Sequence, residues 1–306
     1  MQTATLSPRI NSVVDNSPLF IKAPGTCGEL MQGAIDGQDF LVNCPIDLFS
    51  YAKLQSIETT GLHLHNENSY TKIRDTIDLV MDEYKLKLNH SLKMHSNIPR
   101  GKGMASSSAD ITAAFEAICR CSDIALTPED FAHIVTEIEA SDLVHFLGIS
   151  HLNHLTGKLF ESMPVPQGMS ILVVDCGGYI ATDTFDRRQA HSLYRNNQPY
   201  LKETLKLLKF GLHNENLAAV AKAATRSAKF NQKIHYKPQF DDLLAISQTA
   251  GALGVNCAHS GTVLGVMYRS NDKVREFLLN DITQHFGSDI SIVGNFMMIS
   301  GGCYEY

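Results

Sequence analysis

Apolar and polar positions along the first half of the chain predict short strands alternating with helices. Strands are expected over residues 19–22, 40–44, 48–54 and 92–96, and helices over 71–84, 106–121 and 127–138. Pro45 is expected to split the second strand from the third, because proline cannot pair in a central strand. Thr127-Pro-Glu-Asp130 places a cap, a proline and two acids where a helix begins.

The second half follows Pro164-Val-Pro166, which we predict to be a domain boundary because prolines neither continue a helix nor pair in a central strand. The predicted organisation is a leader over 1–17, an N-terminal domain over 18–164 and a C-terminal domain over 165–306. Strands are expected over 169–174, 262–268 and 296–299, and helices over 200–208, 217–228 and 240–252.

Composition and charge narrow the function classes. A chain of 306 residues is longer than a single hydrophobic core usually organises, which favours two domains. Its formal net charge of −6 argues against a nucleic-acid-binding protein, which needs a basic surface. The polar segment 1–17 does not resemble a secretory signal, and no apolar run approaches the ~20 residues of a membrane helix. Seven scattered cysteines favour reduced thiols. We therefore expect a cytoplasmic protein without membrane or nucleic-acid partners; the oligomeric state stays open.

The segment 98–109 carries the strongest candidate chemistry. It joins an expected strand to an expected helix, and Gly101 and Gly103 let the backbone turn sharply and approach a ligand. The helix that follows presents unpaired N–H groups and the positive end of its dipole. Lys102 adds a charge, and three consecutive serines add hydroxyls. This combination suits a nucleoside triphosphate.

Two other phosphate-binding patterns do not fit this segment. The order of residues is not Gly-x-x-x-x-Gly-Lys-Ser/Thr, and Ser106 stands where a dinucleotide fingerprint needs its third glycine. A glycine turn capped by serine, without any ligand, is the remaining structural alternative.

The segment resembles the signature of the GHMP kinases, Pro-x-Gly-x-Gly-Leu-Gly-Ser-Ser-Ala. Pro99, Gly101, Gly103, Ser106 and Ser107 occupy matching places, whereas positions 104, 105 and 108 depart from the usual Leu, Gly and Ala. The resemblance implies an ATP-dependent small-molecule kinase. It also implies a set of ATP-binding residues: Pro99, Arg100, Gly101, Lys102, Gly103, Met104, Ala105, Ser106, Ser107 and Ser108.

Two further segments resemble motifs of the same superfamily. Residues 23–29 (Ala-Pro-Gly-Thr-Cys-Gly-Glu) look like its first motif, which lines the substrate pocket, and residues 259–265 (His-Ser-Gly-Thr-Val-Leu-Gly) look like its third. A surface turn and a helix-ending turn are the structural alternatives. The substrate-binding residues implied are Gly28, Glu29, Asn43, Asp47, Asp142, Ser260 and Gly261.

Acidic residues near 140 supply candidates for the chemistry. Asp142 resembles the aspartate that takes the substrate proton in many GHMP kinases, and Lys102 is its expected catalytic partner. Glu139, with Ser107, is expected to bind Mg²⁺. We expect Glu139 and Asp142 to share a helix face, since they are three residues apart. Glu137 is expected to face solvent.

Three histidines close by, His145, His151 and His154, have no acidic partner at zinc-binding spacing. We expect them on the surface or in loops.

The resemblance implies an α+β, two-domain fold of the GHMP-kinase type, with the active site in the cleft between the domains. Within the superfamily, residues 20–302 look most like the L-threonine kinases of adenosylcobalamin synthesis. L-threonine is then the expected substrate, with ATP and Mg²⁺ as cofactors. The candidates for its ammonium partner are Glu29 and Asp47, and those for its carboxylate partner are Lys22, Gln32 and Asn43. A kinase for another alcohol, a related decarboxylase and a non-catalytic nucleotide sensor stay open.

Overall fold

The structure is a computed structural model that describes residues 17–66, 70–122, 124, 126–178 and 187–306. Its described strands form one mixed sheet in the order β10-β7-β9-β8-β1-β2-β4-β3. β11 pairs with β1, and β5 pairs with β2 and β6. The strands are β1 (Leu19–Ile35), β2 (Gln38–Ser56), β3 (Leu62–Leu64), β4 (His90–Ser96), β5 (Ile149–Leu152), β6 (Leu159–Met163), β7 (Met169–Asp175), β8 (Gly254–Cys257), β9 (Val263–Arg269), β10 (Ser291–Met297) and β11 (Tyr304–Glu305).

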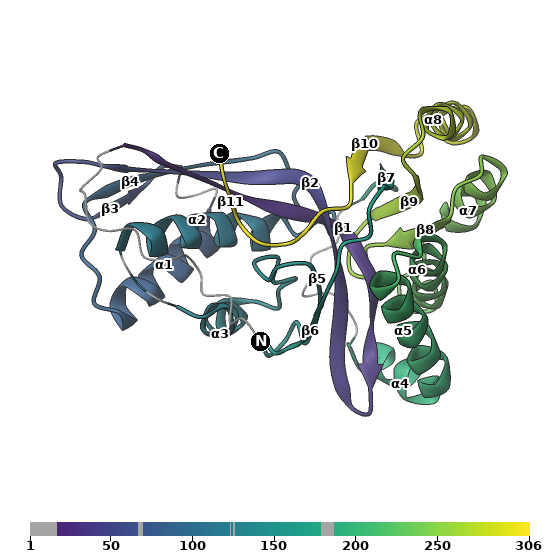
Figure 1. The fold of residues 1–306 in the computed structure, drawn as a ribbon, viewed down its shortest axis with the longest axis horizontal. Helices are drawn as coiled ribbons and strands as arrows, with labels where there is room; N and C mark the ends of the chain where they lie inside the picture. Colours follow the sequence, from purple (N-terminus) through teal and green to yellow (C-terminus); the bar gives the residue numbers. More distant parts are fainter. Residues whose placement is uncertain (1–16, 67–69, 123, 125, 179–186) are drawn as a thin grey trace.

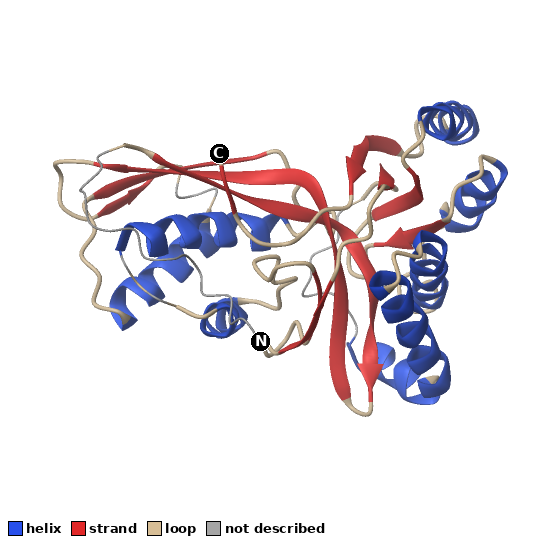
Figure 2. Cartoon of the chain, viewed as in Figure 1, coloured by secondary structure: helices blue, strands red, loops and turns tan. Residues whose placement is uncertain are grey.

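The helices lie in two groups at opposite ends of the sheet (Figures 1 and 2). The first three lie along the half of the sheet that carries β2, β3 and β4, whereas the rest lie at the end that carries β8 and β9. They are α1 (Thr71–Glu83), α2 (Ser106–Ser122), α3 (Pro128–Ile138), α4 (Arg187–Asn196), α5 (Gln198–His213), α6 (Leu217–Asn231), α7 (Phe240–Thr249) and α8 (Asp272–Phe286).

A long hairpin of β1 and β2 joins the two ends of the molecule (Figure 1). Two expectations about it were wrong. Residues 23–28 are part of β1 rather than a separate turn, and β2 runs through Pro45. The register of the hairpin shifts between Pro24 and Thr26 and again on both sides of Glu29. Pro45 pairs with Thr26 between two of these shifts, where an irregular ladder tolerates a residue without an N–H.

The predicted domain boundary lies between β6 and β7. The sheet continues across it through β1, which pairs with β2 on one side and with β8 on the other. A large apolar core contains residues from both sides of the boundary, and a smaller one lies between β7–β9 and the last two helices. The division at 164/165 stays a prediction. The predicted leader falls almost entirely outside the described residues.

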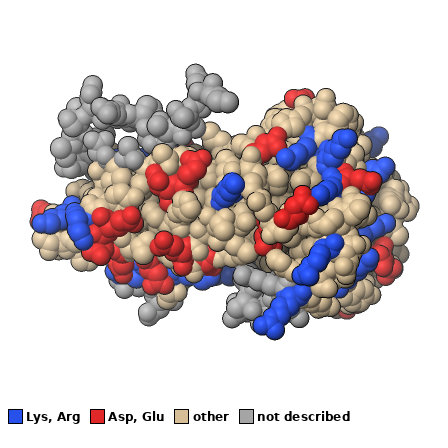
Figure 3. Space-filling model, turned by 90° about the horizontal axis from the view of Figure 1, so that it is seen from below, with Lys and Arg blue, Asp and Glu red and all other residues tan. Residues whose placement is uncertain are grey.

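Charge is unevenly spread over the face of the molecule that Figure 3 shows. Acidic side chains gather over the half that carries α1 and α3, and Lys and Arg side chains are interspersed with acidic ones over the other half. Within the described part of the chain, no helix has the length and apolar character needed to span a bilayer.

Candidate active site

Backbone contacts bring the three motif segments together. In β1, the N–H groups of Thr26 and Gly28 donate to the carbonyls of Met104 and Gly103, at 3.0 and 3.2 Å. The N–H of Thr262 donates to the carbonyl of Lys102 at 3.0 Å. A Cβ on Gly261 would collide with that carbonyl. The predicted phosphate loop is therefore fixed on both sides by the other two motifs.

The loop reaches helix α2 through three residues in the left-handed region. Gly101, Gly103 and Ala105 have φ values of 70°, 78° and 55°. Ala105 then accepts a hydrogen bond from the N–H of Ala109 at 2.9 Å, which starts the helix. The first N–H groups of α2, from Ser106 onward, have no partner within the helix and are available to an anion.

An open cleft of about 300 Å³ lies over this helix start. Arg100, Glu139 and Asp142 line it, as do residues from the start of α1 that include Tyr70 and Lys72. Most of the predicted ATP-binding residues line it too: Arg100, Gly101, Gly103, Met104, Ala105, Ser106, Ser107 and Ser108. Size, open backbone donors and basic side chains make this cleft suitable for a triphosphate.

Ser107 and Glu139, the predicted metal ligands, are in contact. The Ser107 hydroxyl donates to one carboxylate oxygen of Glu139, and Lys72 pairs with the other. The described residues hold no cluster of three or more His, Cys, Asp or Glu suited to a metal. Two hard oxygen ligands nevertheless fit Mg²⁺, which commonly takes one or two protein ligands and completes its shell with phosphate oxygens and water.

Asp142 lies beyond the end of α3 and is held from several sides. Its carboxylate accepts from the Thr26 hydroxyl at 3.4 Å, its N–H donates to the Ser108 hydroxyl, and its carbonyl accepts from Asn43. The expected common helix face with Glu139 was wrong, because α3 ends at Ile138 and Glu139 is already extended. The two carboxylates are neighbours on the wall of the cleft instead.

The surroundings of Asp142 favour its protonated form. Burial raises the pKa of Asp142 to about 8; the negative charge of Glu29 and, less, of Glu139 adds to this rise, whereas the Thr26 hydrogen bond opposes it. A carboxyl group with such a pKa holds a proton at neutral pH, and the fraction that is ionised, which grows as the pH rises toward 8, can accept a proton from a substrate.

A second, smaller cavity, of about 60 Å³, meets the cleft at Asp142. Glu29, Ala140, Asp142 and Ser260 line both spaces. The residues that line only the second cavity are Gln32, Asp39, Leu41, Ser141, His154, Leu155, His191 and Tyr194. A molecule in the second cavity would therefore meet a phosphate-bearing molecule at Asp142.

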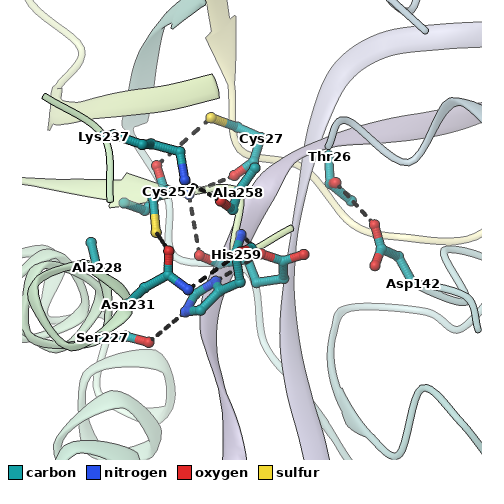
Figure 4. Close-up of polar contacts among 12 residues, drawn as sticks. Thr26, Cys27, Asp142, Ser227, Ala228, Asn231, Lys237, Cys257, Ala258 and His259 are labelled. Atoms are coloured by element: carbon teal, nitrogen blue, oxygen red, sulfur yellow. Dashed lines mark hydrogen bonds and ion pairs between the residues drawn. The ribbon is translucent and has the colours of Figure 1, made fainter. Parts of the chain in front are cut away.

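Glu29 is fixed by His259 of the third motif. Figure 4 shows His259 with Ser227, Asn231 and Lys237 around it. One oxygen of the Glu29 carboxylate accepts from the N–H of His259 at 2.9 Å and lies 2.8 Å from Nδ1 of the same residue. The other ring nitrogen of His259 lies 2.9 Å from the Ser227 hydroxyl on α6. Nearby, the buried amine of Lys237 donates to the carbonyl of Ala258. This network connects the wall of both cavities to the helices behind it.

Several predicted site residues lie elsewhere. Lys102 pairs with Asp175 at 2.7 Å and does not line the cleft, and neither does Pro99. Asp47 is exposed, lines neither space and accepts from the N–H of Met297 at 2.7 Å. Asn43 is buried and holds the backbone at Ser150 and Asp142.

Gly28 and Gly261 line neither space and form backbone contacts that shape the loop. The expectation for the histidines was wrong for His151, which is buried in a strand; His145 and His154 lie in turns, as expected, although His145 is buried. His151 belongs to strand β5, which no apolar pattern had indicated. Glu137 is exposed, as expected.

Some lining residues were not anticipated. Lys72 lies at the exposed start of α1, where a lysine carries no distinctive signal, and Asp39 follows an Asp-Gly hairpin turn at 36–37. His191 and Tyr194 belong to α4, a helix with no sequence-based expectation. Their spacing of three residues along a helix could have suggested a shared face.

Comparison with known proteins supports the picture that the geometry gives. The family model "GHMP kinases N terminal domain" matches residues 71–147, which include the loop, Glu139 and Asp142. The L-threonine kinase of Citrobacter freundii is 28% identical over 267 residues, which cover 86% of this chain and 91% of that protein. The L-threonine kinase of Salmonella typhimurium strain LT2 is 28% identical over 248 residues, which cover 80% of this chain and 81% of that protein.

The fold of the chain also agrees with that of a solved kinase structure. A crystal structure of homoserine kinase from Cytophaga hutchinsonii superposes with a TM-score of 0.73 at 14% identity, covering 98% of this chain and 100% of that one. Residues 71–147 therefore match the N-terminal domain of the GHMP kinases. The predicted α+β GHMP-kinase fold is confirmed by the superposition.

Ala105 stands where the GHMP signature has glycine, in a conformation that disfavours a side chain. The left-handed conformation costs an L-residue about 1–2 kcal/mol. We expect Ala105→Gly to leave the free energy of unfolding unchanged or slightly higher. Ala109→Gly, inside α2, should lower it by about 1 kcal/mol or more. Urea unfolding measures both; equal losses for the two variants would contradict the strain at Ala105.

The raised pKa of Asp142 predicts how stability depends on pH. Between about pH 4 and pH 8 the folded chain keeps a proton on Asp142 that the unfolded chain has released, so stability falls as pH rises. Asp142→Asn cannot ionise and should flatten this part of the profile. Urea midpoints at pH 5, 7 and 9 measure the difference. Parallel profiles for wild type and variant would show that Asp142 is not perturbed.

Proposed function

We propose that this chain transfers the γ-phosphoryl group of ATP to the hydroxyl of L-threonine, giving O-phospho-L-threonine for the side chain of cobalamin. The observation that carries the proposal is the position of Asp142 where the open cleft meets the second cavity. The proposal is also supported by two relatives named L-threonine kinase, each aligned over most of its length.

In this proposal the phosphates of ATP lie against the loop and the first turn of α2. N–H groups from Ser106 onward, Arg100 and Lys72 are the donors within reach of the cleft. Ser107 and Glu139 would hold Mg²⁺, which supplies positive charge to the β- and γ-phosphate oxygens. Lys102 is left out of this set, since it does not line the cleft and its amine is held by Asp175.

The acceptor occupies the second cavity. Its hydroxyl oxygen attacks the γ-phosphorus, the bond to the bridging β–γ oxygen breaks, and Asp142 takes the hydroxyl proton as ADP leaves. The reaction depends mainly on positioning, which the hydrogen bonds that Asp142 accepts from Thr26 and Asn43 and donates to Ser108 provide.

The charge of the second cavity favours an amino acid over the acceptors of other GHMP kinases. Three acids line it, Glu29, Asp39 and Asp142, and no Lys or Arg is among the described residues that do so. Such a wall attracts an ammonium group and repels an acceptor that carries only a carboxylate, such as mevalonate. A neutral sugar would gain no electrostatic binding energy from the acidic wall of the cavity.

ADP release from Mg-ATP by the purified chain tests the proposal. We expect strong release with L-threonine, weaker release with L-serine and L-homoserine, and background rates with galactose and mevalonate. Phosphothreonine should appear in equal amount to ADP. ATP binding without turnover of any of these acceptors would favour a nucleotide sensor instead.

Asp142→Asn is the control that assigns the activity to this chain. It should lower turnover by about 10²–10⁴ while ATP still binds, since a positioned base contributes that much. An unchanged rate would mean that Asp142 is not the base.

The proposed Mg²⁺ ligand can be tested by substitution. Glu139→Gln should raise the Mg²⁺ concentration needed for half-maximal rate and lower the rate by about 10²–10³, a common cost of losing a preorganised electrostatic contact. Glu137→Gln, two residues away and exposed, is the matched control and should change neither. Identical magnesium titrations for both variants would remove Glu139 from the metal site.

A further inference from the structure

The far wall of the second cavity carries a negative and a basic side chain in direct contact. Nε2 of His191 on α4 lies 2.9 Å from one carboxylate oxygen of Asp39 on β2. Both residues line the second cavity, and neither lines the open cleft. Their pairing therefore belongs to the side of the cavity that faces away from the phosphates.

The position of Asp39 is fixed by its hairpin. The tip of β1–β2 is attached to α5, because Gln198 accepts from the N–H of Asp36 and donates to the carbonyl of Ala34. Lys202 pairs with Asp36 at 2.7 Å. Asp39 pairs with Ala34 across the hairpin, so these contacts hold its backbone directly beside α4.

The Asp39–His191 contact leaves bonding capacity for a ligand. It uses one oxygen of the carboxylate and one nitrogen of the ring. The second oxygen of Asp39 can accept from an ammonium group, and the Nδ1–H of a protonated His191 can donate to a carboxylate. The Asp39 side chain is 18% exposed and that of His191 is 39% exposed, so both remain accessible from the cavity.

Tyr194 lies one helical turn after His191 and lines the same cavity. Its hydroxyl is buried and has no hydrogen-bond partner among the described residues. Burial raises the pKa of Tyr194, and the nearby charges of Asp39 and Glu29 raise it further, so the hydroxyl stays a donor. A buried donor without a partner costs free energy unless a ligand or water supplies an acceptor.

We propose that Asp39 and His191 bind the α-ammonium and α-carboxylate groups of the acceptor, with Tyr194 donating to the same carboxylate. The inference rests on the proposed function in taking the second cavity as the acceptor site. It makes a free α-amino acid the substrate class. It also replaces Asp47, which lies outside the cavity, by Asp39 as the ammonium partner, and leaves Glu29 to hold the third motif.

Paired analogues separate the two contacts. 3-Hydroxybutyrate lacks the ammonium group of threonine, and L-threoninol lacks its carboxylate. Asp39→Asn should weaken L-threonine binding by about 10–100-fold, the usual range for a hydrogen bond to a charged group, and leave 3-hydroxybutyrate unchanged. His191→Gln should weaken L-threonine and 3-hydroxybutyrate alike and leave L-threoninol unchanged. Calorimetric titration of the full chain gives the affinities, and KM gives a second reading.

Two surface variants serve as matched controls. Asp82→Asn removes an exposed carboxylate paired with Lys85, and His213→Gln removes a histidine paired with Glu161; neither residue lines the second cavity. Both should bind L-threonine like wild type, and all four variants should keep wild-type affinity for Mg-ATP. Thermal unfolding shows whether each variant is folded.

The outcomes separate this inference from the proposed function. Unchanged L-threonine affinity in Asp39→Asn and His191→Gln would overturn the inference while leaving the kinase proposal intact. Binding of L-threonine that depends on both residues, without phosphoryl transfer, would support the inference and overturn the kinase proposal. Wild-type protein that binds no free amino acid but phosphorylates another alcohol would also overturn the inference.

Discussion

The site depends on three backbone segments that approach one another more closely than side chains would allow. β1 donates two N–H groups to the phosphate loop, and the third motif donates another from the opposite side. Gly28 and Gly261 are required here because a Cβ on either would collide with backbone of a neighbouring motif. The loop is not part of a helix or strand, so these backbone contacts determine its shape and direct the N-terminal end of α2 toward the cleft.

The electrostatics of the site follow from that convergence. Glu139 and Asp142 come from one segment and Glu29 from another, and Glu29 and Asp142 line both spaces. Burial, together with the negative charges of Glu29 and Glu139, raises the pKa of Asp142, so its ionised form readily accepts a proton. The Lys and Arg side chains line the cleft, and none is among the described residues that line the second cavity, so the two spaces differ in their preference for charge.

The sequence predicted the parts of the fold whose signals are local. Helix α3 has its capping box at Thr127 and Asp130, and α2 begins where the serine run indicated. Bulged strands were harder, because Pro24, Gly25 and Pro45 read as breakers although the sheet absorbs them at register shifts. Short strands such as β5 carry too few residues for an apolar period to show.

The site was predictable to a similar degree and for similar reasons. The loop, Glu139 and Asp142 lie close together in the sequence and match a signature as a unit. Asp39 and His191 are 152 residues apart and meet only through packing of α4 on the hairpin, which no local pattern encodes. Lys102 lies within the signature segment at a position that the signature leaves open, and Asp175 from β7 holds its amine away from the cleft.

The pairing of β1 has a consequence for how the protein folds during synthesis. β1 emerges early, but its partners β8 and β11 follow more than 200 residues later. Contacts of such long sequence separation form slowly. A ribosome must therefore complete most of the chain before the phosphate loop has both of its neighbours. Until then one edge of β1 remains open, so the nascent chain is a natural client for chaperones that cover unpaired strands.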